Sequence, residues 1–243
     1  MRSEQDSYAK FRTTRWSVVA MAGSDDPEAQ KALEELCHEY WFPLYAFARR
    51  SGHSFAEAKD LVQGFFVQVI EKSLFARANE GKGKLRTFLL TAFRRHMAHE
   101  GRKQDAQKRG GVHPLLSIDE MNAESWYHEQ MIDGESPEHM YDRQWALTLL
   151  DKAVIELGRQ WSMKKKETTF KALRPFLTQS PEGPAYDEAQ QILGISRANL
   201  KTTVHRLRAE FRECLREQVR GTQLSDSEWQ DELQTLLQAI HPS

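Results

Sequence analysis

The sequence predicts an all-α protein built from two helical modules. Apolar residues recur at steps of three and four along several segments, which is the spacing that places them on one face of a helix. No segment shows the period-two alternation of a half-buried strand over a useful length. The chain has 243 residues, 40% apolar and 28% charged, which is enough for two small domains with their own cores.

The N-terminal module is expected to cover residues 1–107 and to be a small helical bundle. Pro27 suits the first position of its first helix, which ends before a Ser-Gly-His break. Ser54 and Glu57 have the spacing of a capping box ahead of the second helix. The third helix follows a loop with two glycines at residues 78–84.

Residues 108–140 are predicted to be a linker, because they contain several Gly and Pro residues and no sustained periodicity. The linker is acidic: residues 111–141 hold seven acids and no Lys or Arg. A disordered acidic spacer explains this composition.

The second module is expected to cover residues 141–222 and to contain a helix-turn-helix. Its first helix begins at Ser136 and Pro137, and another helix is predicted at residues 164–177. Gly194 then supplies a tight turn, and Ser196 stands at an N-cap position. Residues 223–243 form a final amphipathic helix, which we expect to pack on the second module or to contact a partner.

The helix after Ser196 has the pattern of a recognition helix. Leu200, Val204 and Leu207 form its apolar stripe, and basic residues line a neighbouring face. An ordinary amphipathic surface helix has the same pattern and is the alternative. The residues expected to enter a major groove lie in the first three turns: Arg197, Asn199, Lys201, Thr202, His205 and Arg206.

Residues 82–109 form a strongly basic segment with nine Lys or Arg and two acids, although the net charge of the chain is only −1. This density favours binding to phosphates, and a solvated basic helix face is the alternative. The nine cations are Lys82, Lys84, Arg86, Arg94, Arg95, Arg102, Lys103, Lys108 and Arg109.

Several classes of protein are disfavoured by the sequence. Cys37 and Cys214 are the only cysteines, so a disulfide framework and a four-cysteine metal site are excluded. His96 and His99 are three residues apart, whereas a metalloprotease helix needs a separation of four. We find no Gly-rich phosphate loop, nucleophile elbow or paired carboxylates, and therefore expect no enzyme, metal or cofactor. We also expect a cytoplasmic protein without a membrane span, since no apolar run approaches about 20 residues.

Three segments in this order resemble a bacterial sigma-70 family sigma factor of the extracytoplasmic-function (ECF) type. They are DLVQGFFVQVIEK at residues 60–72, KLRTFLLTAFRRHMAHEGRK at residues 84–103, and the helix-turn-helix. TTRWSVV at residues 13–19, GKGKLRTFL, and AQKRGG followed by LLSID resemble more narrowly a subgroup found in planctomycete- and verrucomicrobia-like bacteria.

The resemblance implies a σ2-like first module and a σ4-like second module that bind core RNA polymerase and promoter DNA. The basic segment would read and help to melt the −10 element, and the recognition helix would read the −35 element. Asp60, Gln63 and Phe66 would dock on the polymerase. The acidic linker would thread the polymerase cleft and mimic RNA there, as an alternative to a plain spacer. The resemblance also allows for an anti-sigma factor as partner, and we expect a monomer when the protein is free.

This chain departs from the family pattern at two places. Arg95 and His99 stand where the family usually has Asn and Asp, and Lys59 interrupts an acidic signature. The main alternative function is a helix-turn-helix regulator that binds DNA without acting as a sigma subunit. A third is an interaction protein that binds polymerase and recruits nothing.

Overall fold

The computed structural model describes residues 27–71, 84–104, 120–180, 182–222 and 229–240. All regular structure in these ranges is helical, which confirms the all-α prediction. The chain forms two compact units: a first unit of Met1–Trp145 with Gly221–Ser243, and a second unit of Ala146–Arg220. The division falls inside helix α6 (Pro137–Met163) and not in the 108–140 segment. None of the described helices is long and apolar enough to cross a membrane.

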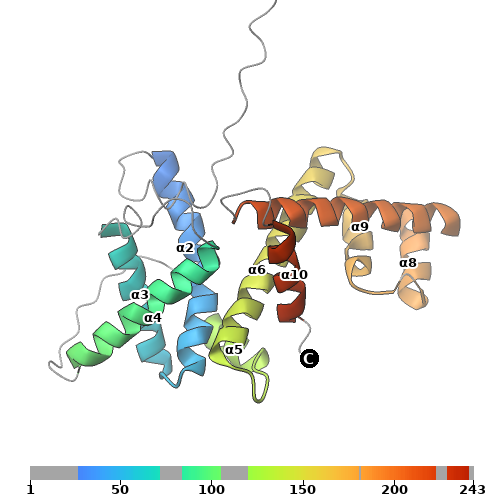
Figure 1. The fold of residues 1–243 in the computed structure, drawn as a ribbon. Coiled ribbons are helices and arrows are strands. Elements are labelled where there is room, and N and C mark those ends of the chain that lie inside the picture. Colours follow the sequence, from blue (N-terminus) through green and yellow to red (C-terminus); the bar gives the residue numbers. More distant parts are fainter. Residues whose placement is uncertain (1–26, 72–83, 105–119, 181, 223–228, 241–243) are drawn as a thin grey trace, which may run out of the picture. The chain divides into compact units, whose positions relative to one another are not determined.

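The first unit is built on α2 (Pro27–Arg50), α3 (Phe55–Glu71) and α4 (Leu85–Gln104), with α4 lying across α3 (Figure 1). The capping box at the start of α3 is confirmed. The backbone N–H of Ser54 donates to Glu57 Oε2 at 2.9 Å, and the N–H of Glu57 donates to Ser54 Oγ at 3.4 Å. The three helices share an apolar core whose largest buried side chains are Tyr40, Leu44, Tyr45, Phe65, Phe66, Leu85, Leu89 and Phe93.

Residues 120–129 correct the linker prediction, because they form a helix, α5 (Glu120–Glu129). Tyr127 is buried, and Trp126 meets Phe42 of α2 edge-to-face with ring centroids 5.9 Å apart. Glu124 accepts hydrogen bonds from Arg49 Nη2 at 2.6 Å and from the Tyr45 hydroxyl. A helix of 10 residues is marginal in isolation, so tertiary contacts stabilise it.

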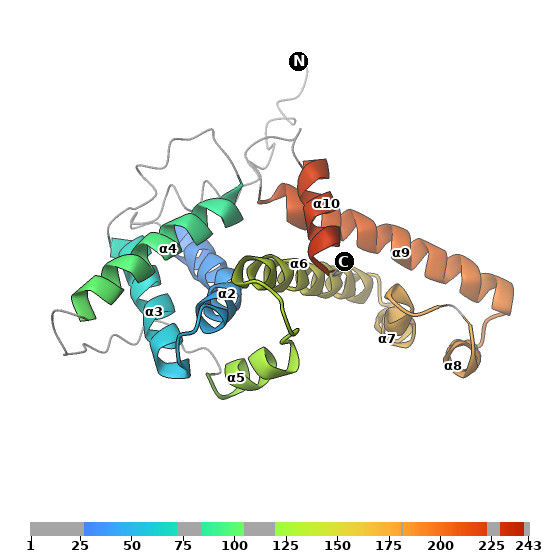
Figure 2. The same ribbon diagram turned by 60° about the horizontal axis from the view of Figure 1, so that its bottom comes forward.

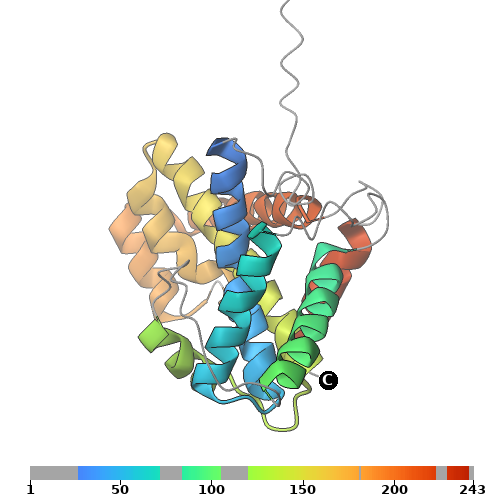
Figure 3. The ribbon, with the colours of Figure 1, turned by 90° about the vertical axis from the view of Figure 1, so that its left-hand side faces the viewer.

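Helix α10 (Trp229–Ile240) belongs to the first unit, so the expectation that it packs on the second module is wrong. It lies beside α4, as Figure 3 shows. Glu232, in its first turn, is fully buried and forms ion pairs with Lys84 and Arg86. A buried carboxylate needs such partners, and these two cations lie at the start of α4.

The second unit contains the rest of α6, α7 (Glu167–Leu173), the 3-10 helix η1 (Arg174–Leu177), α8 (Pro184–Leu193) and α9 (Arg197–Arg220). The helix predicted at 164–177 is thus split into α7 and η1. Figure 2 shows α8 and α9 joined by a short turn. Gly194 adopts φ +61° in that turn, and Ser196 Oγ accepts the N–H of Asn199 at 3.3 Å. Both features confirm the helix-turn-helix signals in the sequence.

Candidate nucleic-acid interface

The first turns of the recognition helix α9 expose several polar side chains. Leu200, Val204 and Leu207 are buried and fix the orientation of the helix. All six residues predicted to contact DNA are exposed: Arg197, Asn199, Lys201, Thr202, His205 and Arg206. The first turns of the helix therefore carry side chains that can reach the edges of bases in a major groove.

Arg197 has contacts that hold it against α8. Its Nη1 lies 3.2 Å from Asp187 Oδ1, and its guanidinium stands 5.5 Å from the ring centroid of Tyr186. Both members of the ion pair are largely exposed, so the pair is worth little for stability. These contacts place the Arg197 guanidinium beside the turn between α8 and α9 and leave it exposed to solvent.

Arg208 lies on the basic face of α9, yet it contacts the protein itself. Its Nε donates to the Phe176 carbonyl at 2.8 Å and its Nη2 donates to the Gln179 carbonyl at 2.7 Å. The Phe176 carbonyl lies in η1 and the Gln179 carbonyl follows it, so Arg208 ties the recognition helix to η1 and the residues after it. Charge alone did not distinguish this structural arginine from the exposed Arg206 and Arg212.

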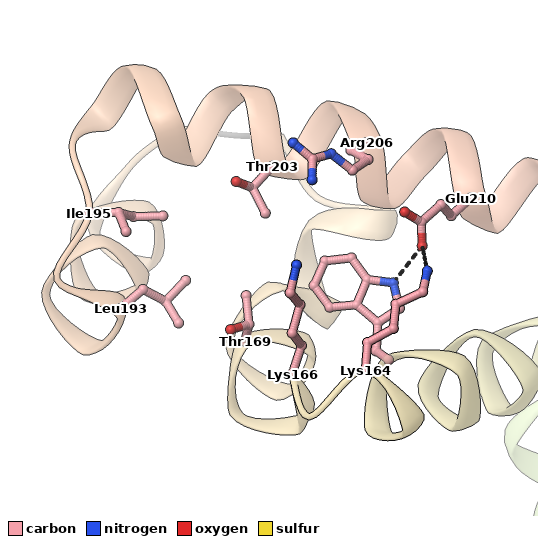
Figure 4. Close-up of a pocket in the computed structure, with 9 residues that line it drawn as sticks. Lys164, Lys166, Thr169, Leu193, Ile195, Thr203, Arg206 and Glu210 are labelled. Carbon is pink, nitrogen blue, oxygen red and sulfur yellow. Dashed lines mark hydrogen bonds and ion pairs between the residues drawn. The ribbon is translucent and has the colours of Figure 1, made fainter.

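A cationic hollow of about 290 Å³ lies beside α9 in the second unit (Figure 4). Lys166 and Thr169 line one wall, and Thr203 and Arg206 line the other. Glu210, at one end, already accepts hydrogen bonds from Trp161 Nε1 at 2.8 Å and Lys164 Nζ at 3.4 Å. Lys166 and Arg206 are donors of the kind that bind a DNA phosphate, whereas Leu193 and Ile195 make the end of the hollow near the turn apolar. Lys166 is not among the DNA-contacting residues predicted from the sequence.

The basic segment of the first unit is only partly described. Lys82, Lys108 and Arg109 lie outside the described residues, as do the side chains of Arg102 and Lys103 at the end of α4. Arg94 and Arg95 are exposed on α4. Arg94 forms an ion pair with Glu138 and stands 5.3 Å from the ring centroid of Phe47. Half of each side chain of this pair is exposed, so phosphate can compete with Glu138 for Arg94.

Arg86 corrects the sequence prediction, because it is buried in a network of ion pairs. Its Nε lies 2.7 Å from Glu232 Oε1, and its Nη1 is paired with Asp142. Its guanidinium also stands 5.1 Å from the ring centroid of Trp145. Burial lowers the pKa of Arg86, but the hydrogen bond to Glu232 and the charges of Asp142 and Glu232 raise it by more. The net pKa is therefore above the usual value, and the side chain stays charged. Arg86 is therefore closed to phosphate in this structure.

Lys84 is the second cation held in this network. Its Nζ lies 2.6 Å from Glu232 Oε2, and its side chain is 27% exposed. Lys84 is thus engaged but remains at the surface, in contrast to Arg86.

The three predicted polymerase contacts do not share one exposed face of α3. Asp60 is exposed and Gln63 is half-buried, but Phe66 is 2% exposed and packs on Phe65 with centroids 5.5 Å apart. Each step of three residues rotates a side chain by about 60° around a helix, so Phe66 has turned into the core. Phe66 is a core residue in this structure.

His96 and His99 do not form a joint site. His96 is buried beside the rings of Phe65 and Phe93, and Gly64 leaves the space that its imidazole fills. His99 is exposed near Glu100. Among the described residues no group of three or more His, Cys, Asp or Glu could hold a metal ion.

The acids of the predicted linker are partly neutralised within the first unit. Besides Glu124, Glu135 is paired with Arg143 at 2.7 Å and with His139 at 2.8 Å. Burial raises the pKa of Glu135, but the hydrogen bonds from Arg143 and His139 lower it more, so the net shift is downward. Glu129 and Asp133 are exposed, and Asp119 lies outside the described residues. Glu124 and Glu135 are therefore structural, which weakens the idea that this segment mimics RNA.

Residues 29–217 match a protein-family model described as ECF sigma factor, which covers most of the chain. Searches of curated proteins and of solved structures found no match.

Proposed function

Because the chain belongs to the ECF sigma factor family and so acts in transcription initiation with RNA polymerase, we propose that it reads both a −35 and a −10 promoter element. The observation that carries this proposal is the row of exposed polar side chains on the first turns of α9. Those side chains would read bases upstream, and the adjacent cationic hollow with Lys166 and Arg206 would hold a backbone phosphate.

The −10 element would be bound by the basic segment around α4. Arg94 and Arg95 are its exposed described cations, and Lys84 sits at its start. Promoter melting requires a site that captures unstacked bases while nearby cations neutralise phosphates, so no catalytic group is needed. We also propose membership of the planctomycete- and verrucomicrobia-like subgroup, on the TTRWSVV, GKGKLRTFL and AQKRGG segments.

Core polymerase would bind the exposed side of α3 through Asp60 and Gln63. The Asp60→Ala and Gln63→Ala double variant should bind core polymerase more weakly and keep the thermal melt of the parent, because neither side chain lies in the core. Glu35→Ala, which removes an exposed acid from α2, is the matched control and should bind as the parent does. An equal loss of melting temperature and of binding would make Asp60 and Gln63 structural instead.

In vitro transcription with purified core polymerase and a promoter library is the test of the function. We expect promoter-specific transcripts that depend on this protein, and little promoter affinity by the protein alone. Tight, sequence-specific gel shifts by the isolated chain, without transcripts when core is added, would favour the helix-turn-helix regulator.

A further inference from the structure

Helix α10 lies beyond the part of the chain that matches the family, which ends at residue 217. It nevertheless belongs to the first unit and carries the fully buried side chain of Glu232. Its twelve residues include Asp231 and Glu232 but no Lys or Arg. An isolated helix of this length is marginal in water, so docking on the first unit is what holds it together.

The docked helix neutralises the start of α4. Glu232 Oε2 lies 2.6 Å from Lys84 Nζ, and Glu232 Oε1 lies 2.7 Å from Arg86 Nε. With Asp142 included, the network contains two carboxylates, Glu232 and Asp142, and two cations, Lys84 and Arg86. Release of α10 would leave two cations and one carboxylate.

The network can lose α10 without leaving Arg86 unpaired. Arg86 keeps Asp142 and the face of the Trp145 ring when Glu232 departs. Lys84 has no such second acid among the ion pairs of the described residues, and its side chain is already partly exposed. The cation set free by release of α10 is therefore Lys84.

We propose that α10 is a built-in competitor of promoter DNA, whose Glu232 occupies Lys84 until a DNA phosphate takes its place. This inference rests on the proposed function, because Lys84 stands in the segment assigned to the −10 element. A DNA phosphate and the Glu232 carboxylate would pair with the same ammonium group and repel each other, so each weakens the binding of the other. The free protein is thereby held in a state of lower affinity for DNA.

The expected size of the effect follows from one phosphate contact. Each contact contributes about 0.7–0.9 to the log-log dependence of affinity on salt, which at 0.15 M salt corresponds to about fivefold in affinity. Removal of the Glu232 charge should therefore raise affinity for −10 DNA about fivefold and steepen the salt dependence by about one contact.

The test uses the full chain assembled with core polymerase and a fluorescent forked DNA that contains the −10 element. Glu232→Gln should bind this DNA about fivefold more tightly than the parent. Asp231→Asn, which removes an exposed charge from the same turn, is the matched control and should change affinity much less. Lys84→Ala added to Glu232→Gln should cancel the gain. Unchanged affinity in Glu232→Gln, or a gain of equal size in Asp231→Asn, would overturn the proposal.

A measurement on the unaltered chain covers the case in which Glu232→Gln destabilises the unit. Amide hydrogen exchange in α10 should become faster when the holoenzyme binds the forked DNA. Equal protection of α10 with and without DNA would overturn the proposal. If the parent itself gives no promoter-specific transcripts with core polymerase, the proposed function fails; if parent and variants transcribe and bind equally, only the role of α10 fails.

Discussion

Replacement of Arg208 by Ala should destabilise the protein and leave its base preference intact. Arg208 donates two hydrogen bonds, at 2.8 and 2.7 Å, to the carbonyls of Phe176 and Gln179. Hydrogen bonds from charged donors contribute about 1.5–3 kcal/mol each, and we reduce this to about 1 kcal/mol each because Arg208 is only half-buried. The expected loss is about 2 kcal/mol, or about 4–8 °C in melting temperature for a chain of this size.

His205→Ala should behave in the opposite way. His205 lies one turn before Arg208, is exposed, and is placed among the base-reading residues. Its loss should leave the melt unchanged and relax preference at one or two upstream positions by about 1–3 kcal/mol, the usual range for a base contact.

Thermal melts of the full chain and promoter-library selection with core polymerase measure the two effects separately. Arg212→Ala is the matched control for Arg208→Ala, since Arg212 is exposed one turn further along α9. An unchanged melt in Arg208→Ala together with an altered upstream preference would refute the assignment of Arg208 as structural. Intact preference in His205→Ala would refute its role in base reading.

Two further predictions concern packing and pH. Gly158→Ala should cost about 1–3 kcal/mol in urea unfolding, because the new Cβ would lie 2.9 Å from Cε1 of buried Phe170; an unchanged midpoint would mean that the ring moves freely. Burial raises the pKa of Glu124, but hydrogen bonds from Arg49 and Tyr45 lower it more, so its net pKa is below the usual value. The stabilisation by Glu124 is then present above about pH 4.3 and lost as pH falls through the folded-state pKa, so acid should weaken the parent more than Glu124→Gln. Parallel acid-unfolding curves would contradict this.

The candidate site could be predicted from sequence where its signals are local. Gly194, Ser196 and the stripe of Leu200, Val204 and Leu207 lie within 14 residues, and together they placed the exposed face of α9 correctly. The capping box of Ser54 and Glu57 was equally local. Such signals act through hydrogen bonds and side-chain spacing within one or two turns, which the order of residues specifies directly.

The sequence did not show which of the basic side chains are exposed and free to bind DNA. Arg86 and Arg94 look alike in sequence, but Arg86 is buried against Glu232, a residue 146 positions away, while Arg94 stays exposed. Helical periodicity gives the face on which a residue lies and not the partner that covers that face.

The sequence by itself therefore determined most of the helices, the helix-turn-helix and the family resemblance, which the match over residues 29–217 supports at the level of the ECF sigma factors. Only the tertiary structure decided that α5 and α10 belong to the first unit, that Phe66 lies in the core, and that Glu232 neutralises the start of α4. The physical reason is the range of the interactions. Backbone hydrogen bonding and amphipathic spacing are local, whereas burial of a charge depends on a partner brought close by the fold.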